Sequence, residues 1–236
     1  MPAPATIEKL RHVSTATLTT QLFKRGLRNT FIQGARPLAP YSGNLVGPAF
    51  TLRNIPARED LDHVGVFADP EHPQRKAIET IPPGHVLVID CRGDTRAASG
   101  GQILATRLQQ RGIAGIVSDG GMRDAGPIGE MKFPVFCATP SAPLNLAIHH
   151  AIDMNVPVAC GGVAVYPGDI MVGDADGVVV IPAALADEVA NDAAEQERME
   201  EFLLTRIQAG APLRGTYPPS DETRAAYEAW RATQKG

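Results

Sequence analysis

Apolar and polar residues follow one another along the chain in a pattern that predicts a mixed α/β domain. Two short, almost wholly apolar runs, residues 85–90 (HVLVID) and 114–117 (AGIV), are typical of strands that are covered on both faces. Between them, residues 102–112 (QILATRLQQRG) carry apolar side chains at helical spacing and end on glycine. A strand, a helix and a second strand in this order predict a parallel crossover.

The rest of the pattern extends this α/β prediction. The further expected elements are helices over residues 6–26 and 183–207, strands over 45–55, 133–138 and 156–160, and β-hairpins within 163–182, with turns at 167–169 and 174–177. After a Pro-rich joint, a short C-terminal helix is placed to clasp a neighbouring subunit. We therefore expect one domain over residues 1–236, with its core at about 15–210 and a C-terminal arm at 211–236.

Composition and charge exclude two classes of function. The net charge is −4 and no basic stripe is present to match phosphates, so we expect no nucleic-acid partner. No apolar run approaches the roughly 20 residues of a membrane-spanning helix, and the first residues do not form a secretory signal. Three cysteines without a CxxC pair are typical of free thiols in a reducing compartment. We expect a cytoplasmic protein that contacts no membrane.

A glycine-rich loop ahead of the central helix is the first candidate for chemistry. Residues 93–101 (GDTRAASGG) lead directly into the helix that begins near Gln102. The first backbone N–H groups of a helix have no intrahelical acceptor, and the helix dipole favours an anion beside them. Residues Gly101, Gln102, Ile103 and Leu104 therefore form a candidate cradle for a carboxylate or phosphate. The alternative is a loop that only reverses the chain.

The second candidate is the pair Arg123-Asp124, which follows the next strand in SDGGMRD. Ligands of open parallel sheets gather beyond the carboxyl ends of the strands, and this places the pair beside the cradle. An arginine offers a planar fork to a carboxylate, and an aspartate offers oxygen to a hard divalent cation. The alternative is a solvated ion pair on the surface.

These motifs resemble a known family. Residues 100–124 (GGQILATRLQQRGIAGIVSDGGMRD), together with 133–136 (FPVF) and 156–182 (VPVACGGVAVYPGDIMVGDADGVVVIP), resemble the class II 4-hydroxy-4-methyl-2-oxoglutarate aldolases. The same superfamily contains the regulator of ribonuclease activity A. The resemblance covers roughly residues 15–210. It implies a β/β/α swivelling-domain fold, similar to phosphohistidine domains, assembled as homotrimers or homohexamers with sites at the subunit interfaces.

The resemblance also implies a reaction. Asp124 would hold Mg²⁺ or Mn²⁺, while Arg123 and the N–H groups of Gly101–Leu104 would bind the pyruvate part of a small 2-oxo acid. Arg123 and Asp124 would then be the catalytic residues of a lyase that forms a pyruvate enolate. The reaction would be retro-aldol cleavage of a 4-hydroxy-2-oxo acid or decarboxylation of oxaloacetate.

The sequence departs from the family at one position. The family has an acidic residue twenty-one positions before the arginine of Arg-Asp, and this chain has Gln102 there. Glutamine hydrogen-bonds a water but neither neutralises charge nor acts as a base. Two alternatives therefore stay open: a noncatalytic protein-binding regulator, and a related lyase for a sugar-acid-derived 2-oxo acid. Because the regulator branch lacks the aspartate that this chain keeps as Asp124, the enzyme is favoured.

Other polar residues are weaker candidates. An acidic side chain of a neighbouring subunit often completes such sites, and the candidates for this role on the predicted C-terminal helix are Glu197, Glu200 and Glu201. Asp94 and Arg96 lie in the cradle loop and could contact the far end of a substrate. His149 and His150 have no glutamate at zinc-protease spacing, so we expect them to be structural.

Overall fold

The computed structural model describes residues 2–41 and 43–234. Its helices are α1 (Pro4–Leu10), α2 (Thr15–Lys24), α3 (Pro73–Thr80), α4 (Gln102–Gln110), α5 (Ala125–Glu130), α6 (Ala186–Gln208) and α7 (Asp221–Thr233), with 3₁₀ turns η1 (Val64–Ala68), η2 (Asn145–Ala147) and η3 (Ala183–Leu185). Its strands are β1 (Phe31–Ile32), β2 (Arg36–Pro37), β3 (Leu45–Pro56), β4 (Val86–Asp90), β5 (Gly115–Ser118), β6 (Gly121–Met122), β7 (Val135–Cys137), β8 (Thr139–Pro140), β9 (His149–Met154), β10 (Val158–Cys160), β11 (Val163–Val165), β12 (Ile170–Gly173) and β13 (Val178–Ile181). The mixed α/β class is confirmed.

The centre of the molecule is a nine-stranded mixed sheet with the order β1-β13-β12-β3-β4-β5-β7-β2, in which β9 also pairs with β3. Strands β3, β4, β5 and β7 are parallel to one another, and helix α4 connects β4 to β5. The parallel crossover predicted from the apolar runs is therefore confirmed. It brings the carboxyl ends of β4 and β5 to the same edge of the sheet.

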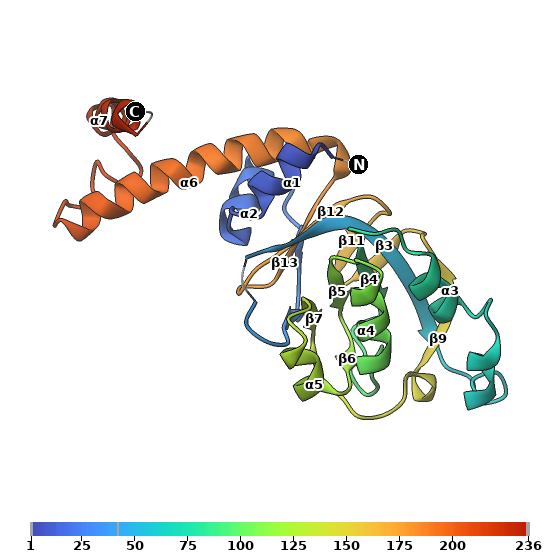
Figure 1. Ribbon diagram of the computed structural model, residues 1–236. Coiled ribbons are helices and arrows are strands. Elements are labelled where there is room, and N and C mark those ends of the chain that lie inside the picture. Colours follow the sequence, from blue (N-terminus) through green and yellow to red (C-terminus); the bar gives the residue numbers. More distant parts are fainter. Residues whose placement is uncertain (1, 42, 235–236) are drawn as a thin grey trace.

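Strand β4 is buried on both faces, as its apolar sequence predicts. Leu87 and Ile89 pack into the core under helices α3 and α4, while Val86 and Val88 pack into a second core on the opposite face. Burying one such side chain fully is worth about 1.5–3 kcal/mol. A third core joins α1, α2 and the start of α6 to β12 and β13. Figure 1 shows α3 and α4 on one face of the sheet and α6 running away from it.

One predicted turn has a different role from the one expected. The prediction of a β-hairpin at Pro167–Asp169 is wrong, because β11 pairs with β10 whereas β12 pairs with β13 and β3. The segment instead carries the chain from one sheet to another. The Asp169 carboxylate fixes this segment by accepting hydrogen bonds from the backbone N–H groups of Tyr166 and Ala183. The hairpin at 174–177 is confirmed by the β12–β13 pairing.

No helix within the described residues is long and apolar enough to cross a membrane.

Candidate active site

The glycine-rich loop after β4 ends at the first turn of α4, as the sequence predicts. Gly101 is the residue before the helix, in an extended conformation and without a side-chain cap. Its carbonyl accepts the N–H of Ala105. The helix therefore presents its first N–H groups at this point, and that of Gln102 donates to Asp124 Oδ2 at 3.0 Å. The cradle predicted at Gly101–Leu104 and the Asp124 carboxylate lie next to each other.

The second loop is joined to the first by backbone hydrogen bonds. The N–H of Arg123 donates to the carbonyl of Gly100 at 3.1 Å, and that of Ser99 donates to the carbonyl of Gly121 at 2.7 Å. Asp124 then adopts a left-handed conformation, with φ of 58°, before α5 begins. Such a conformation is uncommon outside glycine, although aspartate tolerates it better than most residues. The backbone therefore turns sharply where the Arg123 and Asp124 side chains project.

Gly101 is required by the close approach of these two loops. A Cβ atom at this position would lie 2.7 Å from Asp124 Oδ2 and 2.8 Å from Arg123 Nε. Real Cβ atoms do not approach other atoms so closely, so any larger residue would displace the pair. At the preceding Gly100, an added Cβ would make only ordinary contacts, with the Met122 side chain at 3.5 Å and that of Leu104 at 3.9 Å. The two adjacent glycines therefore have different roles.

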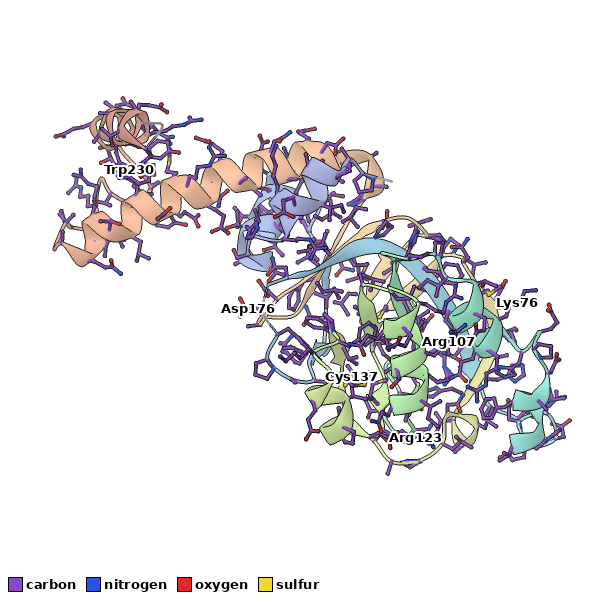
Figure 2. All side chains as sticks on the ribbon, in the orientation of Figure 1. Lys76, Arg107, Arg123, Cys137, Asp176 and Trp230 are labelled. Carbon is purple, nitrogen blue, oxygen red and sulfur yellow. The ribbon has the colours of Figure 1, made fainter. Side chains whose placement is uncertain are left out.

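Arg123 and Asp124 are accessible to a ligand. Their side chains are each 43% exposed, and Arg123 Nε lies 3.8 Å from Asp124 Oδ2. In the part of the chain that is described, Asp124 Oδ1 accepts no hydrogen bond, so this oxygen is open to solvent or to a cation. Figure 2 shows Arg123 below α4, near the loop that carries η2.

The metal ligands that a single chain offers at this site fit a cation that retains most of its bound water molecules. Within residues 2–41 and 43–234, no group of three or more His, Cys, Asp or Glu side chains is placed to hold a metal. Asp124 offers one free carboxylate oxygen, while Gln102 contacts Asp124 through its backbone N–H and has an exposed side chain. Mg²⁺ retains several waters and needs only one or two protein carboxylates. These residues therefore fit Mg²⁺ and would be too few for a structural zinc site.

A cavity opens between the cradle and helix α3. Its volume is about 90 Å³, which is below the roughly 300–1,000 Å³ of sites for drug-sized molecules, so it has room for only a small ligand or a part of one. The cradle glycines and Arg123 form one wall. The other walls come from η1, α3 and η2 and include Phe67, Gln74, Arg75 and Asn145. The sequence interpretation did not identify these residues, because α3, η1 and η2 lie in segments whose patterns predicted no element.

Asp94 and Arg96 lie outside this cavity. Arg96 Nη2 is 2.6 Å from Asp94 Oδ2, and this hydrogen bond lowers the pKa of Asp94 to about 2. The two side chains therefore pair with each other across the surface of the loop, and neither is among the residues that line the cavity. The expectation that they contact the far end of a substrate has no support in this arrangement.

The acidic residues of α6 do not reach the site of their own chain. The Glu197 carboxylate instead accepts the backbone N–H and the hydroxyl of Ser14, at 2.9 and 2.7 Å, where α2 begins. Glu200 accepts a hydrogen bond from Gln196, and Glu201 is exposed. Glu197 therefore has a structural role in this chain.

The histidines and cysteines fit structural roles. His149 is 1% exposed in β9, and burial lowers its pKa, while His150 lies 2.8 Å from the Asp62 carboxylate. All three cysteines are free and buried, which confirms the prediction of free thiols. Burial raises the pKa of Cys91 to about 12 and that of Cys137 to about 11, so neither is a reactive thiolate.

Comparison with known proteins finds one relative that carries an aldolase name and another that is uncharacterized. The chain is 40% identical over 159 residues to a Halalkalibacterium halodurans protein named "Putative 4-hydroxy-4-methyl-2-oxoglutarate aldolase", which covers 66% of this chain and 69% of that protein. It is 38% identical over 126 residues to the uncharacterized protein MJ0644 of Methanocaldococcus jannaschii, covering 52% and 58% of the two chains.

Solved structures share the fold over most of the chain. The crystal structure of Streptomyces coelicolor RraAS2, described as an unusual member of the RNase ES inhibitor RraA protein family, matches with a TM-score of 0.74 and 33% identity, covering 85% of this chain and 96% of that one. An uncharacterized protein from Pseudomonas syringae matches with a TM-score of 0.78 and 26% identity, covering 91% and 98%. The model of the RraA-like family, described as Aldolase/RraA, matches residues 15–180, which include the cradle and the Arg-Asp pair, and this chain therefore belongs to the RraA-like family.

Proposed function

We propose that this chain is a divalent-metal-dependent carbon–carbon lyase that forms a pyruvate enolate from small 2-oxo acids. The observation that carries the proposal is that the start of α4 and Arg123 line one cavity, and that the Asp124 carboxylate lies beside both, 3.0 Å from the Gln102 N–H and 3.8 Å from Arg123 Nε. A relative that carries an aldolase name supports it. We extend the proposal to the β/β/α swivelling class of fold and to one domain over residues 1–236 with an arm at 211–236.

In this proposal the 2-oxo acid carboxylate lies against the N–H groups of residues 103 and 104 in the first turn of α4, since that of Gln102 donates to Asp124. Arg123 lies beside it and stabilises negative charge that develops on the 2-oxo oxygen during the reaction. Asp124, with Gln102 through water, would hold Mg²⁺ or Mn²⁺, which when bound supplies Lewis acidity at the substrate. The helix dipole and the guanidinium together favour a substrate with negative charge at this end.

Retro-aldol cleavage breaks the bond between C3 and C4 of the substrate. The electron pair stays on the pyruvate unit, the 4-hydroxyl proton leaves, and C3 later takes a proton. Within the described residues, no carboxylate or imidazole lines the cavity, so we propose that water accepts and returns these protons. Decarboxylation of oxaloacetate needs no base, because CO₂ leaves and only C3 has to be protonated. Both reactions therefore belong in the test.

The test is release of pyruvate from 4-hydroxy-4-methyl-2-oxoglutarate, oxaloacetate and a sugar-acid-derived 2-oxo acid, with and without Mg²⁺ or Mn²⁺. We expect release with at least one substrate in the presence of metal. Asp124→Asn should lower it by about 100-fold or more and weaken Mg²⁺ binding in calorimetry, since the carboxylate charge is lost. Asp176→Asn removes the same charge from an exposed turn and should change neither quantity.

Two outcomes would contradict the proposal. Release that is insensitive to removal of the metal would exclude the metal-dependent reaction. Absence of release from every substrate would favour the alternative of a noncatalytic protein-binding regulator; the Streptomyces coelicolor structure is described as a member of the RNase ES inhibitor RraA protein family.

A further inference from the structure

Ser99 connects the two loops of the candidate site through buried hydrogen bonds. The residue is 3% exposed, and its hydroxyl lies 2.9 Å from the Gly121 carbonyl and 3.0 Å from the Ser118 hydroxyl, with Met122 Sδ at 3.4 Å. Because a carbonyl only accepts, the Ser99 hydroxyl donates to Gly121 and the Ser118 hydroxyl donates to Ser99. The N–H of Gly120 in turn donates to Ser118 at 3.1 Å. The two hydroxyls therefore form a chain that links the end of β5, the cradle loop and β6.

Ser99 holds the Gly121 peptide through two hydrogen bonds. The Gly121 carbonyl accepts the Ser99 backbone N–H at 2.7 Å as well as the hydroxyl at 2.9 Å. Ala98 pairs with Gly121 in a parallel bridge, and the N–H of Arg123 donates to the Gly100 carbonyl at 3.1 Å. The two loops thus lie side by side as a short parallel ladder. The register of this ladder sets the position of Arg123 relative to the start of α4.

The backbone carbonyl of Ser99 binds a third element. It accepts the side-chain amide of Gln74 on α3 at 2.9 Å, and Gln74 is itself buried and lines the cavity. The N–H and the hydroxyl of Ser99 are therefore engaged with β6, and its carbonyl is engaged with α3. A shift of Ser99 would move the cradle loop, the loop that carries Arg123 and the α3 wall of the cavity relative to one another.

The Ser99 hydroxyl is not needed to satisfy a buried acceptor. The Gly121 carbonyl already has the Ser99 N–H as a partner, so an alanine at position 99 would leave this carbonyl paired. Burying a hydroxyl costs free energy, and the net gain from its hydrogen bond is small. A satisfied polar network does, however, restrict the conformations that its members can adopt. The hydroxyl therefore contributes chiefly to the orientation of the Gly121 peptide.

We propose that Ser99 is a positioning residue whose hydroxyl fixes Arg123 against the first turn of α4. This inference rests on the proposed function, in which N–H groups of α4 bind the substrate carboxylate and Arg123 stabilises charge on the 2-oxo oxygen. When the ladder loosens, the carboxylate stays at α4, but the guanidinium is misplaced at the oxygen where negative charge develops. Loss of the hydroxyl should therefore affect the charged state of this oxygen more than substrate binding.

The test compares the binding of pyruvate and oxalate, measured by calorimetry on the full chain in Mg²⁺. Oxalate is close to pyruvate in size and carries negative charge where the enolate oxygen would lie. We expect Ser99→Ala to weaken oxalate by about 10-fold and pyruvate by less than about threefold, a part of the loss of about 100-fold that a misplacement of about 1 Å can cause. In the same variant, kcat for pyruvate release should fall while KM changes little.

Two further variants separate positioning from loss of stability. Thr51→Val removes a fully buried hydroxyl that donates to the Val156 carbonyl, in the middle of the sheet where Thr51 pairs with Val88. It should lower the midpoint of thermal unfolding and leave both affinities unchanged. Ser118→Ala shortens the hydroxyl chain but keeps the Ser99 donor, and it should weaken oxalate more than pyruvate, by less than Ser99→Ala does. Thermal unfolding checks each fold, and Ser118→Ala carries the test if Ser99→Ala does not fold.

The inference is overturned if folded Ser99→Ala weakens both ligands equally or weakens neither, or if Thr51→Val gives the same loss. A wild type that binds neither ligand would overturn it together with the proposed function. Failure of the proposed function alone gives a different result: a selective loss of oxalate affinity in Ser99→Ala, in a protein that releases no pyruvate, would sustain the positioning role and reject the lyase. Pyruvate release and oxalate affinity that are both unchanged in Ser99→Ala would reject the positioning role alone.

Discussion

At the scale of single residues, Gln102 is where this chain departs from the family pattern, and the structure explains how it can do so. Its backbone N–H, rather than its side chain, contacts Asp124. The side chain is exposed and forms no hydrogen bond with the residues that the structure describes. A glutamine here leaves the positions of Gly101, Arg123 and Asp124 intact while it removes one negative charge from their surroundings.

Restoring this charge should strengthen metal binding. We predict that Gln102→Glu binds Mg²⁺ about 10- to 100-fold more tightly, because a carboxylate that orients metal-bound water typically changes affinity by this factor. The first turn of a helix also favours an acidic side chain. Calorimetry with Mg²⁺ measures the effect, and pyruvate release on the same variant shows whether the added charge helps or hinders the native reaction.

Gln110→Glu adds the same charge at the far, exposed end of α4 and serves as the control. An unchanged Mg²⁺ affinity in Gln102→Glu would mean that position 102 does not face the water shell of the metal. The placement of the metal beside Asp124 would then be wrong.

At the scale of elements, the site depends on how closely the start of α4 approaches the loop between β6 and α5. Backbone hydrogen bonds join the two loops. At Gly101 the loops lie in direct contact, because glycine places no side chain between them. Misplacement of reacting groups by about 1 Å can cost about 100-fold in rate. This close approach is therefore the most sensitive feature of the proposed site.

The two adjacent glycines provide a matched pair to test it. We predict that Gly101→Ala lowers pyruvate release by about 100-fold, since its Cβ would displace Arg123 and Asp124, whereas Gly100→Ala changes it by less than about threefold. Both variants should remain folded, because neither position has a positive φ. Equal effects of the two substitutions on the rate would contradict the close-approach argument.

The pattern of the sequence could predict the elements that carry the cradle but not the opposite wall of the cavity. Apolar runs identify β4, α4 and β5, and their order fixes which edge of the sheet Arg123 and Asp124 occupy. Helix α3 has only eight residues, and the 3₁₀ segments η1 and η2 have five and three, all too short for a periodic signal. Arg75 and Asn145 therefore meet Arg123 only through tertiary packing.

At the scale of the whole molecule, α6 extends well beyond the core that it helps to form. Its first half packs on the sheet, and its second half carries α7 through contacts of Phe202 with Tyr227 and Trp230 (Figure 1). Large apolar side chains stay uncovered near the end of α6 and in the connection to α7: Leu204 is 57% exposed, Leu213 64% and Tyr217 58%. Scattered exposed apolar residues are ordinary, but a cluster on a projecting arm is typical of an interface.

We predict that the chain assembles as three or six copies of its 25.0 kDa subunit, with the end of α6 and its connection to α7 in the contact. Light scattering at micromolar concentration measures the mass. Leu204→Glu combined with Leu213→Glu should shift it towards the monomer, because two charges would be buried without partners. Thr205→Glu adds charge at an exposed neighbour and should have the smaller effect. A wild-type monomer would contradict the prediction, and any residue of the proposed site would then have to come from the same chain.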